Sequence, residues 1–522
     1  MKKLYLLILT SSLSLILSSC LGRCDVDGCK NKRMKDELQC VAHTFTHEDN
    51  YNEITITGYV GKNSDIKIPS EINGKTVTEV GYGSFKDFAS MTSVEIPETV
   101  KIINGAAFSH CSGLTSVKIP KSVEYIGNSA FSSCTGLTNL EIYGSLKETG
   151  CLDGESKNGR VLEVSVSAFS NCSNLKEVYL SEDVKRIYPS MFADCKSIQS
   201  ITLSNSIETI GEEAFSGCEH LEKISIPASV HFLGNQAFSG CTKLKDVEIL
   251  GNLQTVGPGC FLGCSNLTTV TISGTLDYIT ESMFEDCKML KELVLPDSVK
   301  GIEKNAFSNC GSLSNIQLGT NITGIGESAF YNCKSLASIV LPETLLALGE
   351  CTFQNCTQLK TITLPKSLTN IGSQAFSGSG IETLVVPDSV TKFNASTFDG
   401  IKHLTLGTGI TKIPSSAFEN NTTLETIKLL GHIKEVPFPA FRRCKNLKSV
   451  DFVNGVQSIR SSAFVYCESL TAVNIGPTQK LTVGVGAFEK CINLHQVKVK
   501  AKPENCFWFD AFRDCPAKVV YY

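Results

Sequence analysis

The sequence lacks an excess of basic residues. Its 48 Lys and Arg residues are balanced by 52 Asp and Glu residues, and no local run of Lys or Arg stands out. A protein that binds nucleic acid needs a basic stripe to neutralise the phosphates. The sequence therefore predicts that the protein has no nucleic-acid partner.

The sequence also lacks the motifs of common catalytic and metal sites. Its 8 histidines are scattered, and neither H-E-x-x-H nor a nucleophile elbow occurs. No C-x-x-C pair, the usual element of a zinc site, occurs in the repeated part of the chain. We therefore expect no enzymatic activity, no cofactor and no metal site.

Long apolar runs are missing after Cys20, so nothing in the rest of the chain could span a bilayer. The start, MKKLYLLILTSSLSLILSSC, has two lysines, an apolar stretch and a final Leu17–Cys20 run that resembles the lipobox of bacterial lipoproteins. The resemblance implies that residues 1–19 are a signal peptide and that acyl chains on Cys20 anchor the protein in a membrane. The alternative is an ordinary secretory signal with an incidental Cys20. Leu21, rather than an aspartate, follows the cysteine. This resembles lipoproteins that are sorted to the outer membrane or cell surface of a bacterium.

Residues 20–50 have the composition of a charged tether next to this anchor. Three cysteines lie in it, Cys24, Cys29 and Cys40, and their number is odd. A disulfide between two of them, a plain linker and a metal site remain alternatives at this point. The linker is the interpretation that the composition favours.

What the sequence has in abundance is one repeated phrase with phenylalanine at a fixed place. From Phe169 to Phe376 every step is 23 residues, and such a period indicates a solenoid in which each coil packs on its neighbours. The consensus is A-F-x-x-C-x-x-L-x-x-V-x-I-P-x-S-V-x-x-I-G-x-x. The anchors are Phe85, Phe108, Phe131, Phe169, Phe192, Phe215, Phe238, Phe261, Phe284, Phe307, Phe330, Phe353, Phe376, Phe398, Phe418, Phe441, Phe464, Phe488 and Phe512.

Each part of the repeat predicts a piece of local structure. The alternation of Val247 and Ile249 with polar residues is typical of a short strand with its apolar side chains inward. The second apolar pair, such as Val230 and Leu233, is expected on the opposite wall of the coil. The glycine that follows this pair is expected to permit a turn before the next phenylalanine, at Gly211, Gly234, Gly326, Gly349 and Gly372.

This pattern resembles the BspA-type leucine-rich repeat family over roughly residues 54–522. The resemblance implies a right-handed stack of coils with a parallel β-sheet on one face and short turns or irregular helical turns on the other. It also implies a capping coil at residues 51–84 and about nineteen repeats in residues 85–522. Members of the family are typically cell-surface proteins, and several are linked to adhesion, which implies host extracellular or microbial surface proteins as partners.

Fifteen of the 23 cysteines stand three residues after an anchor phenylalanine. Equivalent residues of a solenoid stack with parallel side chains, and apolar residues replace the cysteine in some repeats. We therefore expect buried free thiols rather than disulfides or a metal ladder. These cysteines are Cys111, Cys134, Cys172, Cys195, Cys218, Cys241, Cys264, Cys287, Cys310, Cys333, Cys356, Cys444, Cys467, Cys491 and Cys515.

The period breaks in two places. The step from Phe131 to Phe169 exceeds the regular period by more than half a repeat, which indicates an insertion at residues 146–165 that is either a binding loop or a plain solvated loop. The two steps on either side of Phe398 are shorter than the regular period, which indicates a change of curvature or a weak point in the stack.

One residue in the middle of each strand is expected to point outward, and these residues form the candidate binding face. Its central part is apolar, which indicates a protein contact site, although valine also simply suits a strand. Tyr179 is the only aromatic residue expected in the row. The candidates are Tyr179, Thr271, Val294, Gln317, Val340, Thr363 and Val385. The sequence thus predicts a non-enzymatic surface protein that binds macromolecules; the alternative is a structural or scaffolding component of the cell envelope.

Overall fold

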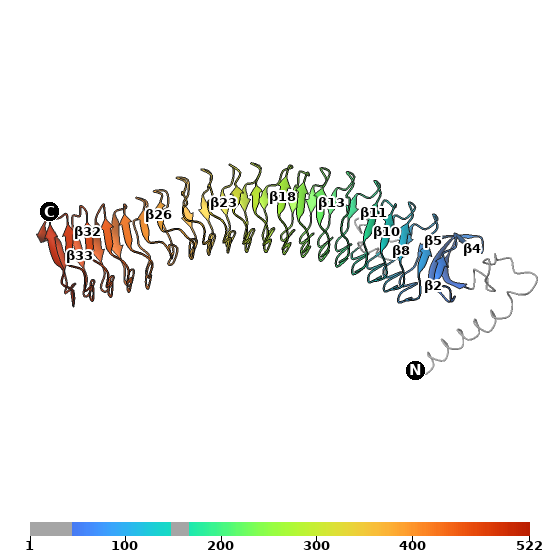
Figure 1. Ribbon diagram of the computed structural model, residues 1–522, viewed down its shortest axis with the longest axis horizontal. Helices are drawn as coiled ribbons and strands as arrows, with labels where there is room; N and C mark the ends of the chain where they lie inside the picture. The colour runs from blue at the N-terminus through green and yellow to red at the C-terminus, as the bar shows by residue number, and fades with distance from the viewer. Residues whose placement is uncertain (1–43, 148–165) are drawn as a thin grey trace, which may run out of the picture. The chain divides into compact units, whose positions relative to one another are not determined.

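The structure is a computed structural model that describes residues 44–147 and 166–522. The chain divides after Val230 into two compact units, unit 1 up to that residue and unit 2 from His231 onward. Cys20, the tether cysteines and most of the expected insertion lie outside the described residues. Figure 1 shows that each unit is a stack of coils with short strands.

Unit 1 begins with a cap and continues as regular coils. Strands β1 and β2 of the cap pair antiparallel, and β2 then pairs in parallel with β5. Strand β1 begins at Phe45, inside the range that the sequence assigned to the tether. The strands of unit 1 are β1 (Phe45–Asn50), β2 (Glu53–Tyr59), β3 (Asp65–Lys67), β4 (Glu71–Ile72), β5 (Lys75–Val80), β6 (Ser93–Glu95), β7 (Ile102–Ile103), β8 (Ser116–Ile119), β9 (Tyr125–Ile126), β10 (Asn139–Ile142), β11 (Glu177–Leu180), β12 (Arg186–Ile187), β13 (Thr209–Ile210) and β14 (Lys223–Ile226).

Unit 2 repeats the same coil and contains a short 3-10 helix, η2 (Pro503–Asn505), before its last two strands. Its strands are β15 (Phe232–Leu233), β16 (Asp246–Ile249), β17 (Thr255–Val256), β18 (Thr269–Ile272), β19 (Tyr278–Ile279), β20 (Glu292–Val294), β21 (Gly301–Ile302), β22 (Asn315–Gln317), β23 (Gly324–Ile325), β24 (Ala347–Leu348), β25 (Asn370–Ile371), β26 (Thr383–Val386), β27 (His403–Leu406), β28 (Thr426–Leu429), β29 (Ile433–Val436), β30 (Ser449–Phe452), β31 (Val456–Ile459), β32 (Ala472–Ile475), β33 (Leu481–Val483), β34 (Gln496–Val499), β35 (Cys506–Trp508) and β36 (Lys518–Tyr521).

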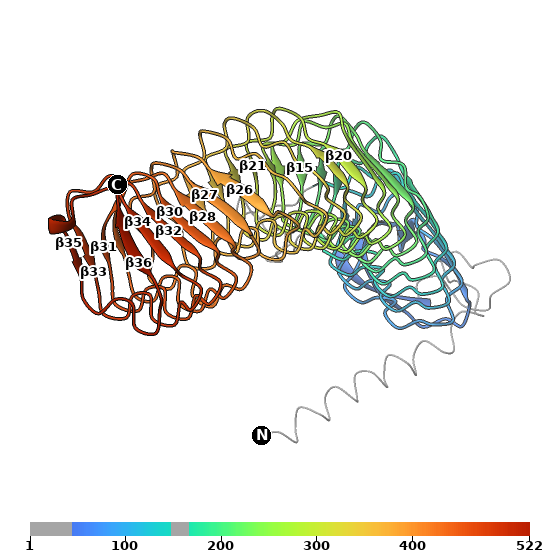
Figure 2. The ribbon, with the colours of Figure 1, turned by 60° about the vertical axis from the view of Figure 1, so that its left-hand side comes forward.

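The strands form two walls, as the sequence predicted. In unit 1 the main wall runs β3-β6-β8-β10-β11, and in unit 2 its longest sheet runs β26-β27-β28-β30-β32-β34-β36 (Figure 2). The opposite wall is built from shorter strands, for example β19-β21-β23-β24-β25. Neighbouring coils pair in parallel and in register, so the coil-stack fold is confirmed. We call the outward side of the main wall the main face.

The anchor phenylalanines form stacks of nearly parallel rings inside the coils. Within unit 2 the ring centroids of Phe441 and Phe464 lie 4.7 Å apart at an interplanar angle of 6°. The rings of Phe307 and Phe330 lie 5.3 Å apart at 10°, and both side chains are fully buried. Each ring therefore packs against the same ring of the next coil, which is why this position tolerates little else in the sequence.

The repeated cysteines are free, as expected, and all of them are buried except Cys515, which is half-buried. The Cys333 thiol donates a hydrogen bond to the Phe307 carbonyl oxygen of the preceding coil at 3.2 Å, and Cys310 does the same to Phe284 at 3.1 Å. All 18 cysteines in the described part of the chain are free thiols. A small side chain that can still satisfy a buried carbonyl explains why cysteine suits this position.

Two residues of almost every coil adopt a left-handed backbone conformation around the anchor. In the coil of Phe330, Ser328 has φ 54° and Asn332 has φ 58°. The residue two places after the anchor has a positive φ in all nineteen coils, and Asn, Asp and Gly are the residues that tolerate it best. Among the residues two places before the anchor, only Pro439 departs from the rule, because its ring fixes φ near −65°. The recurrence of Asn, Asp and Gly two places after the anchor is the signal in the sequence that could have predicted this conformation there; serine is the commonest residue two places before the anchor.

The recurring glycine of the opposite wall has a different role from the expected turn. Gly349 and Gly372 do not have a positive φ. A Cβ atom on Gly372 would clash with the Gly349 carbonyl carbon and the Glu350 nitrogen. The glycine is therefore needed for the close approach of two coils, and the expectation that it permits a turn was wrong at these positions.

We expect Gly372→Ala to destabilise unit 2 by about 1–3 kcal/mol. The new Cβ atom would clash with backbone atoms of the preceding coil, which cannot shift without moving that coil. The matched control is Gly324→Ala, since a Cβ atom on Gly324 would find nothing within 4 Å. Removing that glycine should leave stability unchanged or raise it by about 0.4–1 kcal/mol. Urea denaturation measures both changes, and equal effects of the two variants would contradict this account.

The shortened repeats near Phe398 interrupt the ring stack. Phe393 inserts there and lies 5.2 Å from Phe398 and 5.9 Å from Phe418, with the rings tilted by 53° and 46°. Asn421 replaces the cysteine, and its side-chain oxygen accepts hydrogen bonds from the backbone nitrogens of Thr423 and Leu424. The regular stack resumes at Phe418, whose ring lies 4.9 Å from that of Phe441. The predicted irregularity is therefore a local repacking of the core.

Candidate binding face

The valine residues of the main face are strongly exposed. Val340 is 85% exposed, and Val294 and Val385 are each 61% exposed, whereas their strand neighbours Leu293 and Leu384 are buried. The alternation of inward and outward residues that the sequence predicted is confirmed here. We call Val294, Val340 and Val385 the valine strip.

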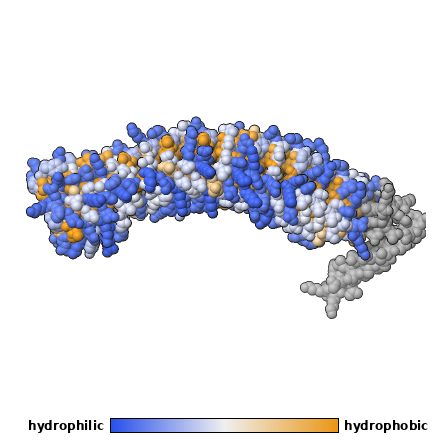
Figure 3. Space-filling view, in the orientation of Figure 1, coloured by the Kyte–Doolittle hydropathy of each residue, from blue (hydrophilic) through white to orange (hydrophobic). Residues whose placement is uncertain are grey.

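The polar candidates share this face. Val294 is paired with Gln317 in the register of β20 and β22, and Thr271 stands in the middle of β18. Thr271, Gln317 and Thr363 are all exposed. Figure 3 shows the wider setting, in which hydrophobic patches lie on a mostly hydrophilic surface.

The hydrogen-bonded ladder of the main wall is interrupted at the valine strip. Strands β20 and β22 pair only with each other, and the next sheet begins at β26. Between them, residues 337–341 and 360–364 are not strands, although the sequence predicted a strand in every repeat. Within the described part of unit 2, these two segments make no backbone hydrogen bonds to neighbouring coils. The face is therefore less firmly held here than in the sheet from β26 to β36.

Tyr179 lies on the main face of unit 1, away from the other six candidates in the sequence, and it has an aromatic neighbour. Its ring centroid lies 5.2 Å from that of Tyr143, at an interplanar angle of 45°. The ammonium group of Lys118 lies over the Tyr143 ring, 5.0 Å from its centroid. Sequence reasoning missed Tyr143. It follows Glu141 by two residues, so the period of the strand could have placed it on the same side.

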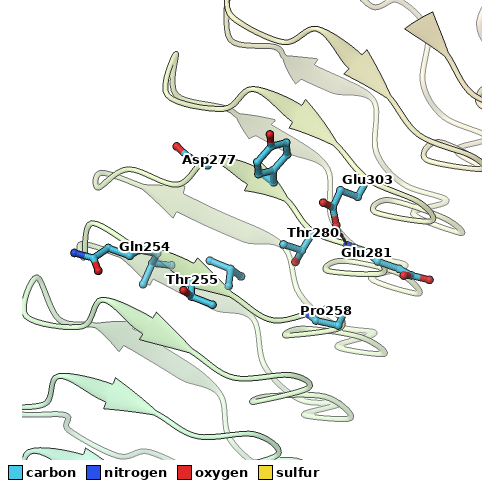
Figure 4. A pocket seen from close by; sticks show the side chains of 10 residues that line it. Gln254, Thr255, Pro258, Asp277, Thr280, Glu281 and Glu303 are labelled. Carbon is cyan, nitrogen blue, oxygen red and sulfur yellow. Dashed lines mark hydrogen bonds between the residues drawn. The ribbon is translucent and has the colours of Figure 1, made fainter.

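A cleft of about 320 Å³ opens between β17 and β19 on the opposite wall (Figure 4). Gln254, Thr255 and Pro258 come from one coil, Asp277, Thr280 and Glu281 from the next, and Glu303 from the third. The Asp277 carboxylate already binds the Lys300 ammonium at 2.8 Å, and Glu303 accepts a hydrogen bond from the Glu281 backbone nitrogen at 3.0 Å. Neither histidine nor cysteine lines the cleft.

The described residues contain neither a metal-binding cluster nor a membrane-spanning helix. In residues 44–147 and 166–522, no group of three or more His, Cys, Asp or Glu side chains has an arrangement that could hold a metal ion. Within the same residues, no helix has the length and the apolar character needed to cross a membrane.

The sequence matches the BspA type leucine rich repeat region over residues 59–151, 163–291, 277–405 and 398–518, which together make up most of the chain. The chain belongs to the BspA-type leucine-rich repeat family. The family that the repeat resembled in the sequence is thereby confirmed. None of the curated proteins matches the sequence.

Solved structures of other leucine-rich repeat proteins are similar to this chain. One is a leucine-rich repeat protein from Bacteroides ovatus, with 22% identity, a TM-score of 0.49 and coverage of 92% of this chain and 98% of that chain. A leucine rich cell surface protein from Faecalibacterium prausnitzii has 25% identity, a TM-score of 0.38 and coverage of 74% and 93%. The pneumococcal vaccine antigen PcpA has 17% identity, a TM-score of 0.29 and coverage of 92% and 96%.

Proposed function

We propose that this protein is a non-enzymatic surface lipoprotein that binds a protein of a host or of another microbe through the main face of unit 2. Cys20, which lies outside the described residues, would carry the lipid anchor at the bacterial outer membrane or cell surface. The observation that carries the proposal is the exposed valine strip, which lies in two exposed rows that contain a single charged residue.

The size of this surface suits a protein partner. Coils of a parallel stack repeat about every 4.8 Å, so the main face from Thr271 to Val385 extends over about 24 Å. A standard protein interface covers about 800 Å² on each partner. The width of such a patch is similar to the length of this part of the main face.

The charge of the surface also suits a protein partner. The centre of an interface is typically depleted of charged residues. Two exposed rows cross this part of the main face, and Glu292 is the only charged residue in either row. The first row is Thr271, Val294, Gln317, Val340, Thr363 and Val385, and the second is Thr269, Glu292, Asn315, Ser338, Thr361 and Thr383.

The proposal is tested by binding of the purified full chain to immobilised extracellular-matrix proteins, mucins and bacterial surface extracts. We expect saturable binding to at least one protein, and an affinity at least about 30-fold lower when Val294, Val340 and Val385 are all changed to lysine. Burial of these side chains in the complex is the physical reason, because lysine would bring three charges into a desolvated contact.

The matched control carries three added lysines elsewhere on the same face, Asn474→Lys, Gln496→Lys and Val520→Lys, in strands that do not pair with the valine strip. It should bind within about threefold of the unchanged chain, since only net charge differs. Equal losses in both triple variants would contradict the assignment of the site to the valine strip. No binding to any of the probes would instead favour the structural role in the cell envelope.

A further inference from the structure

The main face of unit 1 carries a compact group of four side chains that differs from the valine strip. In the register of β8, β10 and β11, Lys118, Glu141 and Tyr179 stand side by side in one row. Tyr143 extends from the end of β10 toward Tyr179, at the ring distance of 5.2 Å. Lys118, Glu141 and Tyr179 are exposed, and Tyr143 is half-buried.

The two charged members of this group are not engaged with each other. Within the described residues of unit 1, neither Lys118 nor Glu141 forms an ion pair, whereas the nearby Lys121 binds Asp183 at 2.9 Å. Lys118 lies over the Tyr143 ring, and Glu141 accepts a hydrogen bond from the Tyr143 hydroxyl group at 3.2 Å. An ammonium donor and a carboxylate with further acceptor capacity therefore flank an aromatic surface.

We propose that this group binds a pyranose ring of a neutral glycan. One side of a pyranose is a surface of C–H groups, which packs on the face of an aromatic ring such as Tyr179. Its hydroxyl groups can donate to the Glu141 carboxylate and accept from the Lys118 ammonium, and a few such polar groups fix the orientation of a small ligand.

The chemistry of the group favours a sugar over a protein surface. Two rings bordered by charges make a patch about the size of one or two sugar rings, which is much smaller than the roughly 800 Å² that a standard protein interface covers on each partner. One positive and one negative charge cancel, which suits a neutral ligand better than a sulfated or sialylated one.

This site is separate from the proposed function of the valine strip, since it lies in unit 1 and takes a different class of ligand. The test is a glycan array with neutral, sialylated and sulfated structures, probed with the full chain, followed by titration of the best neutral glycan. We expect Tyr179→Ala and Glu141→Ala each to lower the affinity at least about tenfold.

Two controls separate this proposal from the previous one. Tyr278→Ala removes an exposed tyrosine of the opposite wall in unit 2 and should leave glycan affinity unchanged, as should the triple lysine variant of the valine strip. Failure to bind any neutral glycan would overturn the proposal. It would also be overturned by neutral glycan binding that survives Tyr179→Ala, or by binding restricted to sulfated or sialylated glycans and lost in Lys118→Ala.

Discussion

The free energy of unfolding of unit 2 is expected to fall steeply when the pH rises above about 9. Burial raises the pKa of the thiols of Cys260 and Cys356 from the ordinary value of 9.0 to about 12. Burial also raises the pKa of five more thiols well above that value, those of Cys264, Cys287, Cys310, Cys333 and Cys467. The folded unit therefore keeps protons that the unfolded chain releases.

The direction and the size of this effect follow from proton linkage. Because the folded-state pKa lies above the unfolded value, the stabilisation is complete below pH 9 and is lost as the pH rises toward the folded-state pKa. At one pH unit above the ordinary value each such thiol costs roughly 1–2 kcal/mol, so seven thiols together cost on the order of 10 kcal/mol. A typical domain has about 5–15 kcal/mol of stability in total, so unit 2 should lose most of its stability by about pH 10.

Urea denaturation between pH 7 and pH 10.5, in the presence of a reducing agent, measures this loss. The control is the double variant Cys310→Ala and Cys333→Ala, which removes two of the titrating groups from the core. Its loss of stability between pH 8 and pH 10 should be smaller by about 3 kcal/mol. An identical loss in the variant and in the unchanged chain would show that other groups drive the alkaline transition.

The main features of the fold could be predicted from the sequence because one interaction repeats in every coil. The fixed step between phenylalanines predicted the stack, and the alternation around residues such as Val247 predicted which side chains face the core. The replacement of the repeated cysteine by an apolar residue, Ile401, in one repeat correctly indicated a buried position without a disulfide. These features depend only on a residue and its equivalents in the next coil, which the repeat itself makes visible.

The features that could not be predicted depend on how neighbouring coils fit together. The period of β10 could have placed Tyr143 on the same side as Glu141, but the contact of Tyr143 with Tyr179 depends on how the coils before and after the insertion pair. The missing strands at residues 337–341 and 360–364 have sequences that alternate like the others. Their hydrogen bonds depend on the spacing of adjacent backbones, and a single repeat does not encode that spacing.

The role of glycine was misjudged for the same reason. Glycine can adopt φ values that other residues avoid, so a recurring glycine such as Gly372 is usually interpreted as a turn residue. Its actual constraint is the backbone of the preceding coil at Gly349, which no local pattern reports. Local patterns thus predict the strands and the buried residues of each coil. The need for a small residue at Gly372 comes from its contact with the preceding coil.

Phe307→Ala should cost unit 2 about 3–5 kcal/mol, because it leaves a cavity in the middle of a ring stack. The Phe307 side chain is fully buried, and its ring lies 5.5 Å from that of Phe284 and 5.3 Å from that of Phe330. The substitution removes the ring contacts with both neighbouring coils at once. In a solenoid each coil is stabilised only by its neighbours, so the coils on either side should also become less strongly coupled.

The expected signature in urea denaturation is therefore a lower midpoint together with a broader or divided transition. Phe509→Ala is the matched control, since it removes the same atoms from a side chain that is 55% exposed. It should change stability by no more than about 0.5 kcal/mol. If the two variants gave the same midpoint, the stacked phenylalanines would not be the source of coupling between coils, and the stability of the stack would have to come mainly from its backbone ladder.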